Sequence, residues 1–389
     1  MTKVYERNPL AGPGVHVLAI GVGDYPHLID GAQKLAKMPL GLGQLSSPPL
    51  SLKAFVTWCL APVMKAGATG LQNDQCSLAT VEVLCSAKGA ISVDVPGGAV
   101  ELERATRANI KAAFTRWRMR VCSDDNNIGV FYFCGHGIMV ADHYLLAEDF
   151  GDDDEAPWDK AFDVSNSLRA MERETKGALY FLVDACRQVS KKIALTAGAI
   201  PTSLMVVDLE KAVVRSSATL IRATGEGKLA FAPGGKVSRF TDVLLTALSG
   251  YCGIRTSGKP TWDVDGETLA TAVRKLLENN NKSSQRKQVS DQQIGGTSVP
   301  LLRVTTAPMV KVEIDLLPTE KRAVAQMSLT SSKGVKFVHD GSKGVLLKDI
   351  PGGVYDVSAQ AAAHEFADLS YPEEGVWPPV YELTMGPAV

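Results

Sequence analysis

The chain has 389 residues, of which 45% are hydrophobic and 21% charged, a composition typical of soluble globular proteins with two or three domains. Its 41 Lys and Arg residues nearly balance its 42 Asp and Glu residues, which argues against binding nucleic acid or an anionic membrane through overall charge. No apolar run approaches the roughly 18 residues of a membrane span. The seven scattered cysteines include no C-x-x-C pair, which favours a reducing, cytoplasmic compartment over a disulfide framework or a zinc site.

Apolar runs alternate with helical patterns through residue 305. Continuous apolar runs between turn residues predict buried strands at 15–22, 128–134 and 178–183. Helical spacing of apolar residues predicts helices at 50–66, at 107–120 with Thr106 as N-cap, at 164–175, from about 240, and at 266–279. Shorter strands are expected at 79–85, 90–95, 99–103, 143–147, 218–223 and 298–304, with a polar, mobile loop at 279–293. This order predicts an α/β fold with a mostly parallel central sheet.

From Pro308 the sequence changes character. Short alternating runs are separated by Gly and Pro turns, at 310–316, 325–329, 335–338, 344–347 and 354–359. No helical pattern is evident there, which favours a small all-β domain resembling a β-sandwich. We therefore expect two domains, an α/β domain at 1–307 and a β-domain at 308–389.

Two of the predicted buried strands end in reactive side chains. His136, with a glycine on each side, follows one strand, and Cys186 follows another shortly after its end. Active sites in open α/β sheets lie at the C-terminal ends of the strands. A thiol needs a neighbouring base to become a thiolate at neutral pH, and an imidazole supplies one. The pair therefore indicates nucleophilic catalysis by a cysteine.

Five segments, in this order, carry a resemblance to a known family: 18–25 (LAIGVGDY), 105–110 (ATRANI), 131–137 (FYFCGHG), 182–187 (LVDACR) and 239–245 (RFTDVLL). The chain resembles the caspase-like cysteine peptidases over about residues 12–305, and is nearer to the bacterial and metacaspase-type members than to animal caspases. The resemblance implies a three-layer α/β/α fold. It also implies Cys186 as nucleophile, His136 as general base and leaving-group acid, and the N–H groups of Gly137 and Cys186 as oxyanion donors.

The alternative interpretation is a buried structural cysteine and a locally satisfied histidine. For Cys134, which precedes the Gly-His-Gly motif, that structural interpretation is preferred, as it is for the other five cysteines.

Substrate preference follows from the residue two positions before the nucleophile. Asp184 stands where animal caspases have Gln, and a carboxylate there would repel an acidic residue and pair with Lys or Arg. Metacaspase-like relatives with an Asp at this position cut after basic residues. Asp24 is a second candidate for the substrate pocket. It could equally be a turn residue before Tyr25 and Pro26.

The segment between Arg187 and Ser217 is far longer than the usual connection of about 4–6 residues. In the resembled family this segment is often cut during maturation. Lys191, Lys192 and Arg215 are the candidate cleavage sites, for the protein itself or for an upstream protease. The alternative is that 206–214 packs as a short ordered element and is never cut.

No cofactor is indicated by the sequence. The acidic run at 149–155 lacks EF-hand spacing, so a solvated loop is expected in preference to a calcium site. The short basic stretch at 282–287 is too small to indicate nucleic-acid binding.

The sequence thus predicts a cytoplasmic cysteine endopeptidase that cleaves protein substrates after Arg or Lys, with no nucleic-acid or membrane partner. By analogy with bacterial relatives, it would act in antiphage defence or regulated cell death. The alternative is a catalytically silent caspase-homology scaffold that binds protein partners. The intact pair of His136 and Cys186 favours the enzyme.

Overall fold

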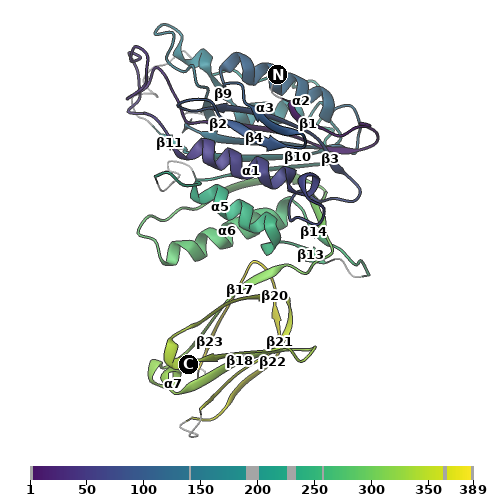
Figure 1. Ribbon diagram of the computed structural model, residues 1–389, viewed down its shortest axis with the longest axis vertical. Coiled ribbons are helices and arrows are strands. Elements are labelled where there is room, and N and C mark those ends of the chain that lie inside the picture. The colour runs from purple at the N-terminus through teal and green to yellow at the C-terminus, as the bar shows by residue number, and fades with distance from the viewer. Residues whose placement is uncertain are drawn as a thin grey trace. The chain divides into compact units, whose positions relative to one another are not determined.

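The computed structural model describes residues 3–139, 142–189, 201–225, 234–255, 258–361 and 366–386. They form two compact units, Met1–Leu245 with Asp263–Arg303, and Thr246–Trp262 with Val304–Val389 (Figure 1). The larger segment of the second unit is Val304–Val389, whereas the domain boundary expected from the sequence is at 308. The second unit also takes in residues 246–262, which nothing in the sequence separated from the α/β domain.

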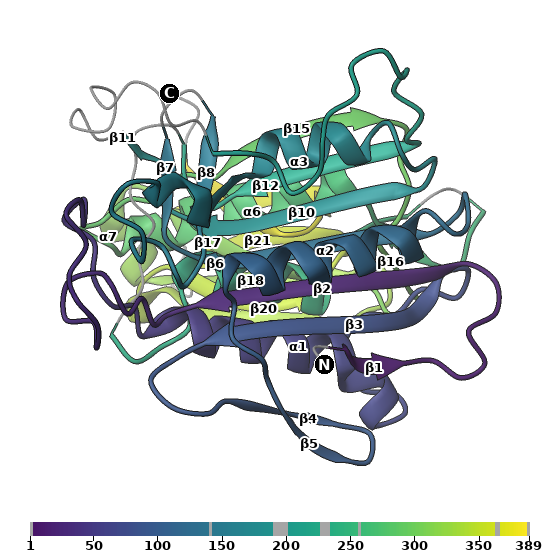
Figure 2. The same cartoon turned by 90° about the horizontal axis from the view of Figure 1, so that it is seen from above.

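A seven-stranded sheet lies at the centre of the first unit, in the order β1-β3-β2-β6-β10-β12-β15 (Figure 2). The five inner strands are parallel, and β1 and β15 pair antiparallel at the two edges. The strands β2, β6 and β10 are buried along their whole length, which explains their continuous apolar sequences. The strand bounds are β1 Lys3–Glu6, β2 Gly14–Val22, β3 Ser77–Ser86, β6 Ile128–Gly135, β10 Ala178–Ala185, β12 Ser217–Arg222 and β15 Asp291–Gly296.

Helices cover both faces of this sheet (Figures 1 and 2). On one face lie α2 (Arg107–Val121) and α3 (Val164–Met171), and on the other α1 (Ser47–Met64), α5 (Arg239–Thr246) and α6 (Gly266–Lys282). The neighbouring residues Phe131 and Tyr132 of β6 point to opposite faces. The Phe131 ring packs against Phe114 of α2, with centroids 6.2 Å apart, and the Tyr132 ring stacks on Phe55 of α1 at 4.3 Å. The expected three-layer α/β/α fold is confirmed.

Besides the central sheet, the structure contains several smaller sheets and short helices. A four-stranded sheet has the order β11-β7-β8-β9, and hairpin β4-β5 and a three-stranded sheet β13-β14-β16 are separate. Their bounds, with those of the short helices, are β4 Ser92–Val95, β5 Gly98–Glu101, β7 Gly137–Met139, β8 His143–Leu146, η1 Pro157–Lys160, β9 Ala161–Asp163, β11 Gln188–Val189, η2 Ala247–Tyr251, β13 Ile254–Arg255, β14 Trp262–Val264 and β16 Leu302–Val304. In the ranges that the structure describes, no helix is both long and apolar enough to cross a bilayer.

The loop expected at 279–293 is shorter than predicted and spans 283–290. Helix α6 continues to Lys282, and β15 begins at Asp291 and pairs with β12 along six residues. Because β15 is an edge strand with mostly exposed side chains and one aliphatic residue, Ile294, its sequence lacks the apolar pattern of a buried strand. The predicted strand at 298–304 is shortened to β16 and does not belong to the central sheet.

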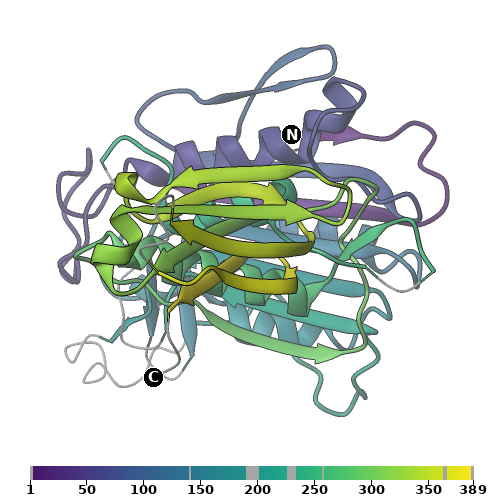
Figure 3. The same ribbon diagram turned by 90° about the horizontal axis from the view of Figure 1, so that it is seen from below.

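Two antiparallel-rich sheets form the second unit, β20-β17-β23 and β19-β18-β21-β22 (Figure 3). They share one apolar core, to which β17 contributes Val312 and Ile314 and β18 contributes Met327. Tyr251, from the 246–262 segment, joins this unit: its hydroxyl donates to Asp349 at 2.9 Å and its ring lies 5.0 Å from Lys311 Nζ. The bounds are β17 Met309–Leu316, α7 Thr319–Ala323, β18 Ala325–Ser331, β19 Lys336–Asp340, η3 Gly341–Lys343, β20 Leu346–Pro351, β21 Gly353–Ala361, β22 Leu369–Val376 and β23 Val380–Met385.

Candidate active site

The fold places His136 and Cys186 opposite each other at the ends of adjacent strands. The parallel pair β6 and β10 ends with Gly135 opposite Ala185, and pairing resumes between β7 and β11 with Ile138 opposite Gln188. The register is the same before and after the two residues, so the backbone holds them side by side. The backbones are also close, because a Cβ atom on Gly137 would lie 2.6 Å from the carbonyl oxygen of Cys186.

His136 is buried, and both its side chain and its backbone are held. Its Nε2 atom lies 2.7 Å from the carbonyl oxygen of Gly43, and its backbone N–H donates to the Tyr25 hydroxyl at 2.8 Å. A carbonyl can only accept, so Nε2 carries the proton and Nδ1 keeps a lone pair. Burial lowers the pKa of His136 to about 4, although the Gly43 carbonyl opposes this shift. The imidazole is therefore neutral near pH 7, with Nδ1 able to accept a proton.

The loop after β2 positions the Gly43 carbonyl. Gln44 fastens this loop, because its Oε1 accepts from the Tyr25 N–H at 2.8 Å and its Nε2 donates to the carbonyls of Tyr25 and Ile29 at 2.9 and 3.1 Å. Ile29 and Gly43 also form an isolated β-bridge. The sequence singled out neither Gly43 nor Gln44, since a backbone carbonyl leaves no signal in residue type.

Cys186 and Cys134 differ in environment. Cys186 is partly exposed, whereas Cys134 is buried. Burial and the nearby Asp184 raise the pKa of the Cys134 thiol well above its usual value, as the sequence interpretation of Cys134 as a packing residue anticipated. A second histidine, His143, places its Nε2 3.0 Å from the carbonyl oxygen of Cys186.

Gly137 has a backbone N–H that β8 does not use. The N–H of Leu146 donates to the carbonyl of His136 at 3.1 Å, and Gly137 stands opposite Leu145. His136 and Leu146 are therefore a hydrogen-bonded pair of the antiparallel ladder. The next pair, Gly137 and Leu145, is then a non-hydrogen-bonded pair, and the N–H of each residue points away from the other strand. The Gly137 N–H is thus directed away from β8.

Asp184 is fully buried beneath this strand end, with one carboxylate oxygen occupied. Its Oδ2 accepts from the hydroxyl of Ser238, from Thr241 Oγ1 at 2.6 Å and from Cys134 Sγ at 3.4 Å. Within the described residues, no hydrogen bond to Oδ1 is found. Burial raises the pKa of Asp184, and the hydrogen bonds from Ser238 and Thr241 oppose that shift. Ser238 directly precedes α5 and Thr241 lies in its first turn, and the sequence did not predict their role.

The carboxylate of Asp24 is already paired. Arg104 forms an ion pair with Asp24 and another with Glu148, and it donates to the carbonyl of Ala87 at 3.1 Å. Glu148 also accepts from the Ser86 hydroxyl at 2.6 Å. This network ties the loop after β2 to the end of β3, which gives Asp24 a structural role. Its contact with substrate remains a prediction.

Lysines neutralise much of the acidic run at 149–155. The Lys34 Nζ atom lies 3.0 Å from Asp154 Oδ2, and the Lys160 Nζ atom lies 3.0 Å from Asp152 Oδ2. Among the residues that the structure describes, no three His, Cys, Asp or Glu side chains converge in a way that could hold a metal ion.

The predicted cleavage sites fall in different settings. Lys191 and Lys192 lie outside the described residues. Arg215 is anchored, because its Nε lies 2.9 Å from Glu172 Oε1 and its backbone N–H donates to the Glu172 carbonyl at 3.1 Å. Residues 206–214 contain neither helix nor strand, and Val206 and Leu209 are 86% and 75% exposed.

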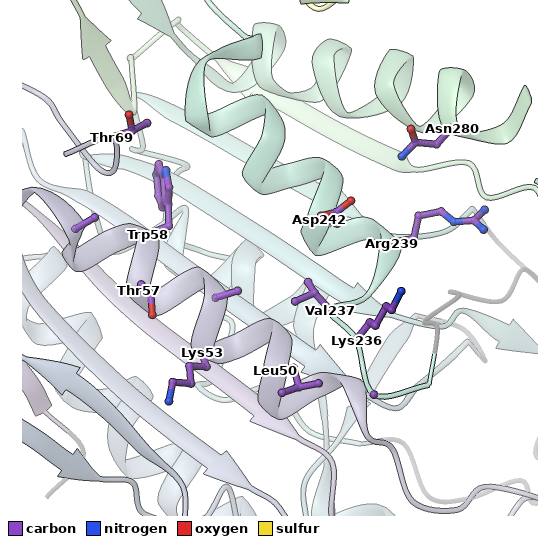
Figure 4. Close-up of a pocket in the computed structure, with 13 residues that line it drawn as sticks. Leu50, Lys53, Thr57, Trp58, Thr69, Lys236, Val237, Arg239, Asp242 and Asn280 are labelled. Atoms are coloured by element: carbon purple, nitrogen blue, oxygen red, sulfur yellow. The ribbon is translucent and has the colours of Figure 1, made fainter. Parts of the chain in front are cut away.

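A separate cleft of about 1040 Å³ lies between α1 and α5 in the first unit (Figure 4). Leu50 and Trp58 of α1 line one side and Val237 and Asp242 the other, with Lys236 at the edge. Neither His136 nor Cys186 belongs to its lining. Nothing in the sequence analysis indicated this cleft.

A neutral imidazole beside a partly exposed thiol, at the strand ends of an α/β sheet, is the side-chain pair used by thiol-dependent hydrolases. Residues 86–297, more than half of the chain, match the family model of the caspase domain, and the match includes both His136 and Cys186. The chain therefore belongs to the caspase-domain family of cysteine peptidases.

The chain is similar to two individual proteins, one by sequence and one by structure. An uncharacterized protein of Sinorhizobium fredii, y4kE, is 33% identical over 267 residues, which cover 67% of this chain and 76% of that protein. The crystal structure of caspase-1 from Spodoptera frugiperda aligns with a TM-score of 0.40 and 12% identity, over 78% of this chain and 96% of its own.

Proposed function

We propose that this chain is a cysteine endopeptidase with Cys186 as the nucleophile and His136 as the general base. The observation that carries the proposal is the uninterrupted register around the two residues, Gly135 opposite Ala185 and Ile138 opposite Gln188. The hydrogen bond from His136 Nε2 to Gly43 supports it, because the bond reserves Nδ1 for proton transfer.

The reaction that this arrangement supports has two steps. The Cys186 sulfur attacks the carbonyl carbon of the scissile peptide bond while Nδ1 of His136 takes the thiol proton. Nδ1 then gives that proton to the departing amine as the C–N bond breaks and a thioester forms. Water, activated by the same imidazole, hydrolyses the thioester and restores the thiol. Water is the only co-reactant needed, so we propose a reaction without a cofactor, with calcium as the alternative to be tested.

The backbone N–H groups of Gly137 and Cys186 are the proposed oxyanion donors. The Gly137 N–H is directed away from β8, on which it has no hydrogen-bonding partner. Preorganised N–H groups stabilise the negative charge that develops on the substrate carbonyl oxygen.

Asp184 supports the proposed preference for Arg or Lys before the cut bond. Its Oδ2 is held by three donors, while Oδ1 accepts from none among the described residues. A carboxylate oxygen fixed in this way would bind a guanidinium or ammonium group and repel an acidic side chain.

The experiment that tests the reaction compares the full chain with three variants on peptides that present Arg, Lys or Asp before the scissile bond. Cys186→Ala and His136→Ala should each lower the turnover rate by at least about 1,000-fold. Cys122→Ser is the matched control, because Cys122 is exposed and follows α2, before β6 begins, whereas His136 lies after the end of β6. It should leave turnover unchanged. Residual activity within about tenfold of wild type in either dyad variant contradicts the assignment.

Specificity has a separate test. Asp184→Asn should reduce kcat/KM for Arg and Lys peptides by about 100-fold, because it removes the charge and keeps the shape. Asp184→Lys should abolish the preference. A wild-type enzyme that cleaves after Asp and ignores Arg refutes the proposed pocket.

We also propose that cleavage between 187 and 217 activates the enzyme. The exposed side chains of Val206 and Leu209 favour access to this segment, and Lys211 adds a basic residue there beside Lys191, Lys192 and Arg215. The cut would be made by the enzyme itself or by an upstream protease. Mass spectrometry of active enzyme tests this: full activity from a chain intact over 187–217 rejects activation by cleavage.

The proposed setting is the bacterial cytoplasm, in antiphage defence or regulated cell death. The support is the analogy with bacterial relatives and the seven cysteines, none of which forms a disulfide in the described structure. Phage plating on cells that express wild type or Cys186→Ala tests this role, and equal plating contradicts it. If the wild type has no peptidase activity and both chains bind the same protein partners, the scaffold alternative replaces the enzyme.

A further inference from the structure

His143 contacts the backbone of the nucleophile. It lies in β8, is 1% exposed, and its Nε2 is 3.0 Å from the carbonyl oxygen of Cys186. Because that oxygen can only accept, Nε2 carries the proton and donates. The other ring nitrogen, Nδ1, is buried and has no hydrogen-bond partner in the described part of the chain. The acceptor of the His143 hydrogen bond is therefore the backbone of Cys186, the residue that carries the thiol.

The surroundings keep this imidazole neutral. Burial lowers the pKa of His143 to about 3, and the positive charges of Arg222 and Arg187 reinforce that shift. Both guanidinium groups bind the Asp291 carboxylate, at 3.0 and 2.7 Å. Like His136, His143 is thus neutral near pH 7, and it differs from His136 in donating from Nε2 to the Cys186 carbonyl.

We propose that His143 is a positioning residue for Cys186. The inference rests on the proposed role of Cys186 as nucleophile. The carbonyl carbon and Cβ of Cys186 are bonded to the same Cα, so a hydrogen bond that holds the carbonyl also holds the position of Cβ, from which Sγ projects. Holding a nucleophile in its attack geometry lowers the barrier to reaction without a change in substrate affinity.

The local fold explains why a histidine reaches this position. His143 pairs with Met139 in the β7–β8 hairpin, two residues along β7 from Gly137. A Cβ atom on Gly137 would lie 2.6 Å from both His143 Nε2 and the Cys186 carbonyl oxygen. Glycine therefore leaves the space through which the hydrogen bond passes. One short stretch of chain, His136 to His143, carries the proposed base, an oxyanion donor and the positioning group.

Two amide substitutions separate hydrogen bonding from packing. The Nε2 of a glutamine reaches about as far as the Nε2 of histidine, whereas the amide of an asparagine stops near the position of Nδ1. His143→Gln should keep kcat within about threefold of wild type, and His143→Asn should lower kcat about tenfold with little change in KM, the effect of losing one buried hydrogen bond. A purely structural role would not distinguish the two variants in this way.

A second readout does not depend on turnover. Iodoacetamide should label Cys186 more slowly in His143→Asn than in wild type or His143→Gln. The exposed Cys122 of the same sample serves as the internal reference. Equal labelling and equal kcat in both variants overturn the positioning role while the proposed function stands. If the wild-type chain has no peptidase activity, the proposed function fails, and the labelling rates alone decide the role of His143.

A third measurement needs no variant. In the full wild-type chain labelled with ¹⁵N-histidine, His143 should show the Nε2–H tautomer and no protonation down to about pH 4. The Nδ1–H tautomer, or titration near pH 6.5, would overturn the inference.

Discussion

The Nε2 atom of His136 lies 2.7 Å from the carbonyl oxygen of Gly43, ninety-three residues earlier in the chain. The proposed base is thus oriented by a backbone carbonyl in the loop after β2, and among the described residues no carboxylate side chain takes that part. A carbonyl cannot become charged, so it fixes the tautomer of His136 without stabilising the imidazolium as strongly as a carboxylate would. The precision of the site therefore depends on how firmly that loop is held.

Gln44 gives the first prediction. Gln44→Glu keeps an oxygen for the Tyr25 N–H but loses the two donations to the carbonyls of Tyr25 and Ile29. We expect kcat to fall about tenfold, because the loss of one or two hydrogen bonds loosens the Gly43 carbonyl. Steady-state kinetics of Gln33→Glu, an exposed change in the same loop, supplies the control. Equal kcat values in the two variants contradict the role of the loop.

A second prediction concerns the glycine after His136. In Gly137→Ala the added Cβ would lie 2.6 Å from the carbonyl oxygen of Cys186 and 2.9 Å from the Cβ of Ala185, so the backbone must move near Cys186. We expect loss of peptidase activity of at least about 100-fold. Gly353→Ala is the control, since its nearest atom would be 3.6 Å away. An active Gly137→Ala enzyme would show that this close approach has no part in catalysis.

The third prediction is acid destabilisation. Burial lowers the pKa of His16 to about 4, and Arg120 and Arg7 add to the shift. The unfolded chain, with a histidine pKa near 6.5, therefore binds more protons than the folded chain between pH 6.5 and 4. The free energy of unfolding should fall as pH drops through this range.

Urea unfolding at several pH values checks this slope. His16→Asn keeps a polar group near Thr80, the partner of His16 Nδ1 at 2.9 Å, and removes the titration. For each pH unit of acidification, the free energy of unfolding should fall by less in the variant than in wild type, and the difference should be up to about 1.4 kcal/mol. Identical slopes for the two chains rule out a neutral, buried His16.

The fourth prediction concerns residues 246–262, which belong to the second unit although the chain on both sides belongs to the first. A chain truncated after residue 307 loses Lys311 and Asp349, the partners of Tyr251. We expect the truncated protein to be soluble, with faster amide exchange at 246–262 and unchanged exchange in β6. Unchanged protection of 246–262 would show that the β-domain does not stabilise this segment.

The sequence anticipated the elements that are buried on both faces. The runs at 128–134 and 178–183 could be recognised because a central parallel strand must be apolar throughout. Once these two strands were expected to be parallel, their C-terminal ends had to meet at one edge. The closeness of His136 and Cys186 followed from that argument, without knowledge of the loops.

The remaining parts of the site could not be predicted, for two physical reasons. The Gly43 carbonyl acts through the backbone, which every residue possesses, so no residue type marks it. The Ser238 and Thr241 hydroxyls, and the pairing of Asp291 with Arg187, join segments far apart in sequence through single polar contacts. Such contacts have no periodicity in the sequence that would reveal them. The sequence of β15 resembled a loop for a different reason, because an edge strand need not be apolar.

The pairing of Arg187 with Asp291 has a consequence for the order of events on the ribosome. Asp291 is 104 residues further along the chain than Arg187, and it begins the last strand of the central sheet. When Cys186 has left the ribosome, the nascent chain still lacks Asp291, the ion-pair partner of Arg187. It also lacks β15, the edge strand that pairs with β12. Newly made chains thus pass through a stage in which the proposed nucleophile is present and its support is missing. The candidate site is completed only after nearly the whole first unit has been translated.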